Sequence, residues 1–255
     1  MVWMRKCLSV ATFSAFAGIS AYAPCGHSSH AATDGAETLV VSCVSVEPWG
    51  FEALDTGAHC GYLAFLAKKA GLDVISHVRP IGRLVAGLGD GSVDIAMVVP
   101  SPERDKLGFE ICRPTHFQAD VAYLKAILAP HQVSDFANKS FGMIKGSTVY
   151  DSFFEAGARR VNIKSMTQGF MMLALHRVDA TFCVQPGCQM AARKAGIDNS
   201  QLGFFPVSDF PVSVMISRRS PLMQDNDAID RLRTICLSDE SKIELDNQIN
   251  KYLDY

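Results

Sequence analysis

The 255-residue sequence lacks the features by which several large classes of protein are recognised. Its formal net charge is −2, with 24 basic and 26 acidic residues, so the positive excess typical of a nucleic-acid-binding protein is missing. No like-charge block and no low-complexity tract occurs in the body of the chain. Beyond the first thirty-odd residues, no apolar run is long enough to cross a bilayer. We therefore expect no nucleic acid as a partner and no stable membrane insertion of the mature chain.

Motifs for metal binding and for common catalytic mechanisms are also missing. No CxxC pair and no Cys/His set with zinc spacing occurs, and there is no GxSxG elbow, HExxH helix or P-loop. Asp-Thr-Gly-Ala at 55–58 matches the signature of aspartic proteases, but it leads into a helical pattern and has no second copy. We read it as a variable loop. The sequence predicts no metal and no cofactor.

The first 31 residues have the pattern of a secretory signal peptide. Two basic residues precede an apolar run at 7–23, which is short for a membrane span and is followed by small residues. Cleavage after Ala31 or Ala32 satisfies the small-residue rule. The alternative is a lipoprotein signal anchored at Cys25, although "YAPC" lacks the residues expected before such a cysteine. Either signal predicts export to an oxidising compartment.

Export changes how the cysteines are interpreted. Six cysteines allow fifteen pairings, between which sequence cannot choose. Cys183 and Cys188 flank the turn "VQPG", so a local disulfide between them is the best single prediction, and a fully reduced, buried set is the alternative. The six in the predicted mature chain are Cys43, Cys60, Cys112, Cys183, Cys188 and Cys236.

Strand and helix patterns alternate along the mature chain. Runs rich in β-branched residues predict strands at 38–46, 73–79, 92–99, 117–126, 140–146, 160–166, 178–185 and 210–220. Apolar residues at helical spacing predict helices at 61–72, 81–91, 147–157, 167–177, 187–197 and within 225–253. Such alternation is typical of an α/β fold with largely parallel strands.

One helix–turn–strand pattern occurs twice. "LVAGLGDGSVDIAMVV" at 84–99 and "FMMLALHRVDATFCVQ" at 170–185 each place Val-Asp before a short apolar strand. The repeat predicts two similar lobes, and the final helical segment is too short for a domain of its own and must return to the first lobe. We expect lobe 1 at 38–120 and 213–255, lobe 2 at 125–207, and hinge strands near 117–126 and 205–216. A ligand cleft would lie between the lobes, at the carboxyl ends of the strands.

These segments, with "GYLAFLAKKAGL", "VVPSPER" and "KGSTVYDSF", resemble the periplasmic solute-binding proteins of bacterial ABC importers, in particular extracellular solute-binding protein family 3. The resemblance implies the two-lobed type 2 periplasmic-binding-protein fold, in which each lobe is a mostly parallel sheet flanked by helices and two hinge strands join the lobes. It implies a periplasmic protein that captures a small molecule in the cleft and delivers it to an inner-membrane permease. We expect a monomer.

The resemblance also suggests which residues bind the ligand. Arg104 falls where the family has an arginine that grips the ligand's carboxylate, and Ser147 and Thr148 match a hydroxyl-bearing turn at a helix start that suits an anion. Asp94 and Asp179 fall at the paired aspartates of the two repeats, which we interpret as braces of the turn between helix and strand. The remaining candidate ligand-binding residues are Trp49, Phe51, Arg83, Val99, Ser101, Val184 and Gln185, of which Trp49 has core packing as its alternative role.

Two departures from the family pattern bear on the ligand. Met97 and Val99 stand where the family has glycine and threonine, and Val184 stands where it has an aspartate that pairs with the ligand's ammonium group. An ammonium group buried without a carboxylate would be costly to desolvate. We therefore expect a carboxylate or a neutral or apolar molecule rather than a standard amino acid.

The sequence predicts a binding protein and not an enzyme. The alternatives are a periplasmic enzyme on the same fold, such as a dehydratase, and a protein that presents its ligand to a membrane sensor. An enzyme would need an acid or base in the cleft, and the available Glu47, Glu52 and His116 each have a simple surface explanation.

Overall fold

The computed structural model describes residues 38–253. The predicted signal peptide at 1–31 and the alternative anchor at Cys25 lie outside the described residues. By contacts the chain divides into Met1–Gly35 and Ala36–Tyr255, and all that follows concerns the second of these units.

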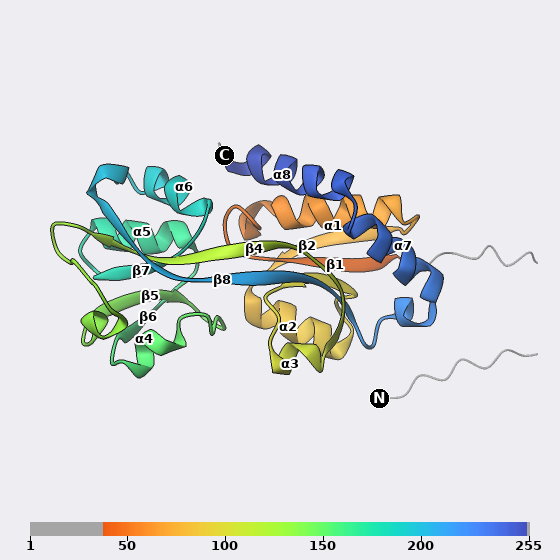
Figure 1. Ribbon diagram of the computed structural model, residues 1–255, viewed down its shortest axis with the longest axis horizontal. Coiled ribbons are helices and arrows are strands. Elements are labelled where there is room, and N and C mark those ends of the chain that lie inside the picture. The colour runs from red at the N-terminus through yellow and green to blue at the C-terminus, as the bar shows by residue number, and fades with distance from the viewer. Residues whose placement is uncertain (1–37, 254–255) are drawn as a thin grey trace, which may run out of the picture. The chain divides into compact units, whose positions relative to one another are not determined.

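Eight strands form one mixed sheet with the order β2-β1-β3-β8-β4-β7-β5-β6 (Figure 1). The strands are β1 Leu39–Val44, β2 Val74–Arg79, β3 Ile95–Val98, β4 Gly108–Leu124, β5 Ser140–Ile144, β6 Arg159–Ile163, β7 Ala180–Val184 and β8 Leu202–Ser217. β1 pairs in parallel with β2 and β3, and β5 pairs in parallel with β6 and β7. The same three-strand unit therefore stands at each end of the sheet. We call β1–β3 with their helices lobe 1, and β5–β7 with theirs lobe 2.

The strands β4 and β8 connect the lobes. They pair antiparallel from Gly108↔Ser217 to Leu124↔Leu202, so both run from one end of the pairing to the other. β8 also pairs with β3 in lobe 1, and β4 with β7 in lobe 2. The expected strands at 117–126 and 210–220 thus overlap the second halves of β4 and β8, which begin earlier, at Gly108 and Leu202. In β4 the earlier half escapes notice because Arg113 and Pro114 interrupt its apolar pattern.

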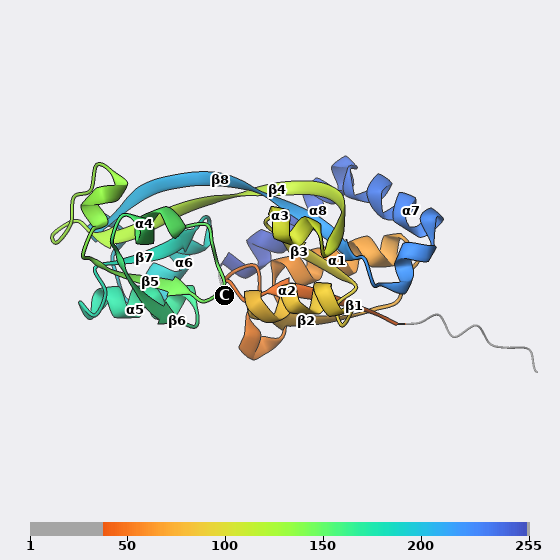
Figure 2. The ribbon, with the colours of Figure 1, turned by 90° about the horizontal axis from the view of Figure 1, so that it is seen from below.

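The helices of lobe 1 are α1 Ala58–Lys69, α2 Ile81–Asp90, α3 Pro102–Asp105, α7 Asn226–Cys236 and α8 Asp239–Leu253. Helices α1, α7 and α8 pack over one face of the sheet, and α2 lies over the other (Figure 2). Helix α1 ends with Lys68 and Lys69 in its last turn and with Gly71 at φ 75°, as expected for cations near the negative end of a helix and a glycine that adopts a left-handed conformation.

The helices of lobe 2 are α4 Asp151–Glu155, α5 Met166–Ala174 and α6 Gly187–Lys194. The predicted helix at 147–157 is only five residues long and begins at Asp151, because 147–150 form a loop and turn after β5. The predicted helix start at residue 147 is therefore wrong, and Ser147 and Thr148 lie in the loop that leads into the helix.

Four buried clusters form the core of the described residues, and the smallest of them contains only Cys43, Cys60 and Val78. One fills lobe 1 between the sheet and α1, α7 and α8, and a smaller one lies under α2. The largest fills lobe 2 and also includes residues of lobe 1 next to it, namely Val46, Trp49, Phe51, Ala58 and Tyr252. Apolar packing is thus continuous from lobe 2 into lobe 1 around these five residues. None of the helices within 38–253 combines the length and the apolar character needed to cross a membrane.

Within residues 38–253 the structure contains three disulfides. Cys43–Cys60 joins β1 to α1, Cys112–Cys236 joins β4 to α7, and Cys183–Cys188 joins the end of β7 to α6. The pair that the sequence favoured is one of the three. Cys43–Cys60 lies within lobe 1 and Cys183–Cys188 lies within lobe 2. Cys112–Cys236 joins α7 of lobe 1 to the half of β4 that lies beside lobe 1, so none of the three disulfides links the two lobes.

Candidate functional site

A cavity lies between the lobes at the carboxyl ends of the parallel strands. Its lining includes the last residue of each of four strands, which are Val44 of β1, Val98 of β3, Ile144 of β5 and Val184 of β7. Parallel α/β sheets bind ligands at these ends. All four residues are β-branched and apolar, so the strand ends offer no side-chain hydrogen bond to a ligand.

Aromatic side chains from the connecting strands form much of the remaining wall. Phe117 of β4 and Phe210 of β8 stand opposite each other in the strand pairing, and Phe182 comes from β7. The cavity measures about 80 Å³.

Arg104 is the only charged side chain among the described residues that line this cavity. It belongs to the short helix α3, where Ser101 caps the helix by accepting a hydrogen bond from the Arg104 backbone amide at 3.3 Å. One guanidinium nitrogen donates to the Val99 carbonyl at 2.6 Å, which turns the side chain back toward the end of β3. Burial lowers the pKa of Arg104, and the nearby Glu103 carboxylate opposes this in part.

No carboxylate within residues 38–253 forms an ion pair with Arg104. An arginine remains cationic even when partly buried. Its guanidinium has five donors, so the donors not used by Val99 suit an anionic group in the cavity.

Lobe 2 contributes hydroxyl groups from the loop after β5. Ser147 and Thr148 line the cavity together with Val149 and Tyr150. The Tyr150 hydroxyl is already engaged, because it donates toward the Asp120 and Cys183 carbonyls at 3.0 and 2.8 Å, and burial raises its pKa. The hydroxyls of Ser147 and Thr148 are therefore the polar groups with which lobe 2 can meet a ligand.

Five of the ten predicted ligand-binding residues line the cavity, and they come from both lobes. They are Val99, Arg104, Ser147, Thr148 and Val184. The other five lie outside its lining, each for an identifiable reason.

Trp49 and Phe51 pack into the protein. Trp49 is 2% exposed and lies with its ring centroid 4.7 Å from Phe117 and 4.9 Å from His59, so it supports the cavity wall from behind. Phe51 packs against Tyr252 of α8 and under the ammonium group of Lys194. For Trp49 the core-packing alternative describes its place in the structure.

Arg83, Ser101 and Gln185 are polar residues at other positions. Arg83 is exposed on α2. The Ser101 hydroxyl is used as the cap of α3 and donates to Glu103 at 3.0 Å. The Gln185 amide donates to the carboxylate of Asp120 at 2.9 Å.

The two repeated aspartates occupy equivalent positions in the lobes. Asp94 accepts a hydrogen bond from the Val40 amide at 2.7 Å, at the start of β1. Asp179 accepts from the amide and the hydroxyl of Ser140, both at 2.7 Å, at the start of β5. Each carboxylate thus joins the turn before one strand to the beginning of its parallel neighbour, far from the cavity end of the sheet. This geometry agrees with a structural role.

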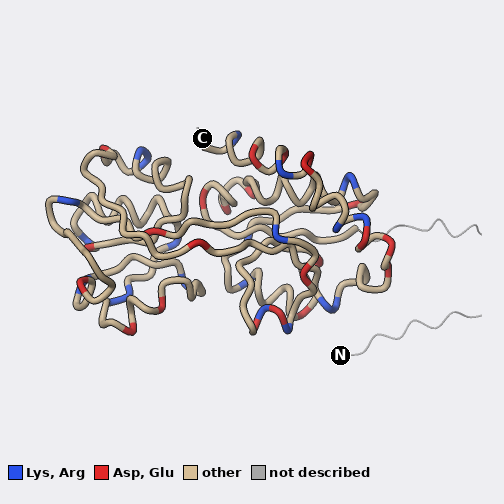
Figure 3. Tube along the Cα trace, in the orientation of Figure 1, with Lys and Arg blue, Asp and Glu red and all other residues tan. Residues whose placement is uncertain are grey.

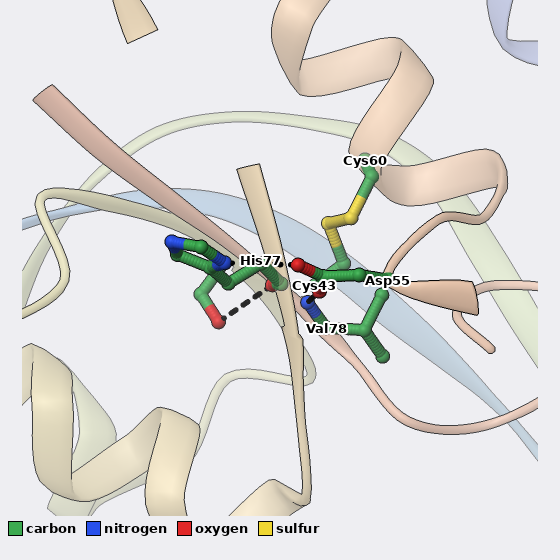
Figure 4. A network of polar contacts seen from close by, with 6 residues as sticks. Cys43, Asp55, Cys60, His77 and Val78 are labelled. Carbon is green, nitrogen blue, oxygen red and sulfur yellow. Dashed lines mark hydrogen bonds and ion pairs between the residues drawn. A yellow bond between two sulfur atoms is a disulfide. The ribbon is translucent and has the colours of Figure 1, made fainter. Parts of the chain in front are cut away.

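The Asp-Thr-Gly-Ala segment also has a local structural role. Asp55 accepts from the Val78 amide at 2.6 Å and contacts Nδ1 of His77 at 3.0 Å, close to the Cys43–Cys60 disulfide (Figure 4). Partial burial opposes ionisation, but these hydrogen bonds and the charge of His77 hold the pKa of Asp55 below its usual value. In the part of the chain that the structure describes, no cluster of three or more His, Cys, Asp or Glu side chains could hold a metal ion.

Reasoning from motifs identified Val99 and Val184 but missed the rest of the apolar walls of the cavity. Phe117 and Phe210 lie in strands whose cavity-facing residues carry no motif, and Val44 and Ile144 appear in the sequence as ordinary strand residues. The available signal was positional, since the last residue of each parallel strand in an α/β sheet faces the ligand site.

Comparison with known proteins gives a match in structure alone. No model of a protein family matches the sequence, and a search of curated proteins finds no match. Solved structures match over most of their length. The GluR0 ligand-binding core in complex with L-glutamate is 17% identical, with a TM-score of 0.69 over 84% of this chain and 99% of that one. The chain has the two-lobed type 2 periplasmic-binding-protein fold.

Two further proteins of this fold show the same likeness. A mutant of ArgBP from T. maritima is 16% identical, with a TM-score of 0.69 over 86% of this chain and 95% of that one. AbpA from Streptococcus pneumoniae, an amino acid ABC transporter substrate-binding protein bound to L-arginine, is 18% identical, with a TM-score of 0.66 over 85% and 94% of the two chains. The α/β, two-lobed architecture expected from the sequence is therefore confirmed.

Proposed function

We propose that the protein is a substrate-binding protein that captures a small carboxylate with an apolar body between its lobes. The observation that carries the proposal is Arg104, the one charged side chain among the described residues that line a mostly apolar cavity. A guanidinium group can bind a carboxylate through two parallel, charge-assisted hydrogen bonds. The valine, isoleucine and phenylalanine side chains then enclose the rest of the molecule, where burial of each methylene contributes roughly 0.8 kcal/mol.

A standard α-amino acid suits this cavity poorly. AbpA and the GluR0 core were solved with amino acids bound, and such ligands carry an ammonium group. Within the described lining of the cavity there is no Asp or Glu, and the position at which the resemblance predicts an acid is Val184. Leaving an ammonium group unpaired there would cost several kcal/mol. This supports a ligand that has the carboxylate but lacks the ammonium group.

Capture follows from the two-lobed arrangement. Arg104 is supplied by lobe 1, and Ser147 and Thr148 by lobe 2, so a ligand that contacts both favours the closed arrangement over the open one. We propose that the closed form then delivers its ligand to an ABC-type permease, and that the protein works as an exported, periplasmic monomer. The ligand would leave unchanged, since the cavity lining offers no carboxylate or histidine as general acid or base in the described part of the chain.

The test is a panel of compounds added to the purified protein, with thermal unfolding as the readout. Butyrate, hexanoate, benzoate and phenylpyruvate represent carboxylates, L-leucine, L-glutamate and L-arginine represent amino acids, and hexanol represents a neutral apolar molecule. We expect stabilisation by at least one carboxylate and by none of the amino acids, with the compound recovered unchanged. Stabilisation by amino acids alone, or conversion of the compound, would contradict the proposal.

Arg104 can be tested directly with the carboxylate that binds best. Arg104→Ala should weaken its binding by about 10- to 100-fold, since a hydrogen bond to a charged group contributes about 1.5–3 kcal/mol. Arg104→Lys keeps the charge but loses the paired donors, so its loss should be smaller. Undiminished carboxylate binding by Arg104→Ala would show that the carboxylate is held elsewhere.

A further inference from the structure

One carboxylate outside the cavity joins the two lobes. Glu47, in the loop that follows β1 in lobe 1, accepts hydrogen bonds from the backbone amide and the hydroxyl of Thr167 at 3.0 and 2.8 Å. Thr167 lies in the first turn of α5 in lobe 2, just after the cap residue Ser165. A carboxylate at the start of a helix is stabilised by the free backbone amides and by the positive end of the helix dipole. Glu47 therefore provides an ionic end-cap for a helix that belongs to the other lobe.

The backbone beside Glu47 is in close contact with lobe 2 as well. A Cβ atom built on Gly187, at the start of α6, would lie 2.4 Å from the Glu47 carbonyl oxygen and 2.7 Å from Cδ of Pro48. Real Cβ atoms do not approach backbone oxygen so closely, and the backbone cannot move aside as a flexible side chain can. The absence of a side chain at Gly187 thus permits the lobes to meet here.

Further contacts lie along the same edge. The Lys194 ammonium group of α6 stands 5.2 Å from the ring centroid of Phe51, and Arg193 donates to the Leu253 carbonyl of α8 at 2.8 Å. The apolar cluster of lobe 2 continues into lobe 1 at this place. In Figure 1, α6 and the end of α8 approach each other here. By contrast, Glu47 is not part of the cavity lining but borders a separate surface crevice with Phe51, Glu52 and Lys164.

We propose that Glu47 is a positioning residue for ligand capture, which holds the lobes closed through its hydrogen bonds to Thr167 and does not touch the ligand. Gly187 permits this closure because it has no side chain to keep the lobes apart. This inference rests on the proposed function, because it explains ligand capture by contacts between the lobes around Glu47 and Gly187, which contribute free energy to the closed form. Part of that free energy is present before any ligand arrives. Ligand binding then needs to supply less, and affinity depends on a residue outside the cavity.

The experiment compares wild type, Glu47→Ala, Glu47→Gln and Gly187→Ala, with Glu52→Ala as the matched control. Glu52 borders the same crevice, but its carboxylate accepts only a 3.4 Å hydrogen bond from Ser45 within lobe 1. Two readouts need no ligand, namely hydrogen exchange of the Thr167 amide by NMR and the radius of gyration from small-angle X-ray scattering. The third readout is the dissociation constant of the carboxylate from the panel that stabilises wild type most.

We expect Glu47→Ala to speed exchange of the Thr167 amide, to raise the radius of gyration and to weaken carboxylate binding by about ten-fold. Gly187→Ala should raise the radius of gyration and weaken binding to a similar extent, since its methyl group wedges the lobes apart. Glu47→Gln keeps one acceptor oxygen and should fall between wild type and Glu47→Ala. Glu52→Ala should match wild type in all three readouts.

The inference is overturned if Glu47→Ala keeps the exchange rate, the radius of gyration and, within two-fold, the dissociation constant of wild type. It is equally overturned if Glu52→Ala changes them as much as Glu47→Ala does. If no compound of the panel binds the wild-type protein, the proposed function fails. Exchange and scattering still decide in that case whether Glu47 holds the lobes together.

Discussion

Lobe 1 and lobe 2 repeat one architecture but contribute different chemistry to the cavity. Each has a central parallel strand flanked by two others, an aspartate that binds the start of that central strand, and β-branched apolar residues at the strand ends that face the cavity. Only lobe 1 adds a charge, because the connection from β3 to β4 carries Arg104 on a short helix. Lobe 2 adds the hydroxyls of Ser147 and Thr148.

The difference lies in the segments that follow the repeated strands. The repeat itself ends at Val98 in lobe 1 and at Val184 in lobe 2, and up to that point the lobes are built by the same rules. After it, lobe 1 forms α3 and its arginine, whereas lobe 2 forms the turn held by the Cys183–Cys188 disulfide and continues into α6. The repeated segments thus determine the shared fold of the lobes, whereas the segments that follow them determine which groups can contact a ligand. Positive and negative residues elsewhere are interspersed over both lobes (Figure 3).

The largest expected effect comes from giving lobe 2 the charge that it lacks. Val184→Asp places a carboxylate at the end of a buried strand, with Val184 itself 8% exposed. We expect it to lower the free energy of unfolding by about 3 kcal/mol or more, because the charge is largely desolvated. An L-amino acid should restore part of this stability, since its ammonium group pairs with the new carboxylate.

Urea unfolding with and without L-leucine or L-glutamate measures both effects. Val184→Asn is the control, because it adds polarity without a charge and should gain no response to amino acids. A Val184→Asp protein as stable as wild type would show that this strand end is open to solvent in solution.

Acid should affect lobe 1 more than lobe 2. His59 of α1 is completely buried between Trp49 and Phe117, its ring nitrogens have no hydrogen-bond partner among the described residues, and burial lowers its pKa to about 3. A histidine that is neutral in the folded state contributes its full stability above its unfolded pKa of about 6.5 and loses it as pH falls toward 3, by up to about 1.4 kcal/mol per pH unit. Between pH 6.5 and 4.5 we therefore expect a loss of about 2–3 kcal/mol.

Unfolding in urea at a series of pH values measures this loss. His59→Leu should flatten the stability curve over this interval, whereas His116→Gln, at an exposed position, should leave the curve as in wild type. A His59→Leu curve as steep as that of wild type would assign the acid sensitivity to other groups.

A smaller loss of stability, similar in the two lobes, is expected from replacing the two repeated aspartates. Asp94→Asn and Asp179→Asn should each lower the free energy of unfolding by about 1–2 kcal/mol, since each removes the charge that accepts backbone hydrogen bonds. Burial works against ionisation of Asp179, but the Ser140 hydrogen bonds hold its pKa below the usual value. Its contribution is therefore present above about pH 4 and lost as pH falls through the lowered pKa. Urea unfolding at pH 7 checks the pair, and a loss confined to one of them would break the equivalence of the lobes.

The smallest effect should come from Arg83, the other arginine that the sequence suggested as a ligand-binding residue. Arg83 lies exposed on α2 and outside the cavity lining. Arg83→Ala should change carboxylate affinity by less than about two-fold, in line with surface substitutions generally. Isothermal titration calorimetry next to Arg104→Ala gives the comparison, and a ten-fold loss for Arg83→Ala would mean that this arginine reaches the ligand in the closed form.

The fold could be predicted from the sequence because its signals are local. The helix end at Lys68-Lys69-Ala-Gly71 and the two Val-Asp turns each specify a short structure, and their order specifies the α/β alternation. Failures occurred where tertiary packing overrides the local pattern. Ser147 and Thr148 have the form of a helix start, yet they belong to a loop that meets α2 near Gly82 and Gly146.

The candidate site was predictable only in part. Arg104 has a motif around it, and it lies on the cavity lining. Trp49 and Phe51 follow a strand as many ligand-binding aromatics do, but their burial depends on Phe117 and Tyr252, which are distant in sequence. Glu47 carries no motif either, and its importance depends on where α5 of the other lobe begins.

The course of β4 and β8 has a consequence for the order in which the protein can fold. Lobe 2 is formed by one continuous stretch between these strands, so all its own strands and helices are present once α6 has been synthesised. Lobe 1 is discontinuous, since β3 needs β8 as its neighbour and α1 packs against α8. The Cys112–Cys236 disulfide spans 124 residues for the same reason. Since chains emerge N-terminal end first, the lobe that begins first is completed last. Its β3 edge stays open to wrong partners until β8 arrives, and the apolar face of α1 stays open until α8 arrives.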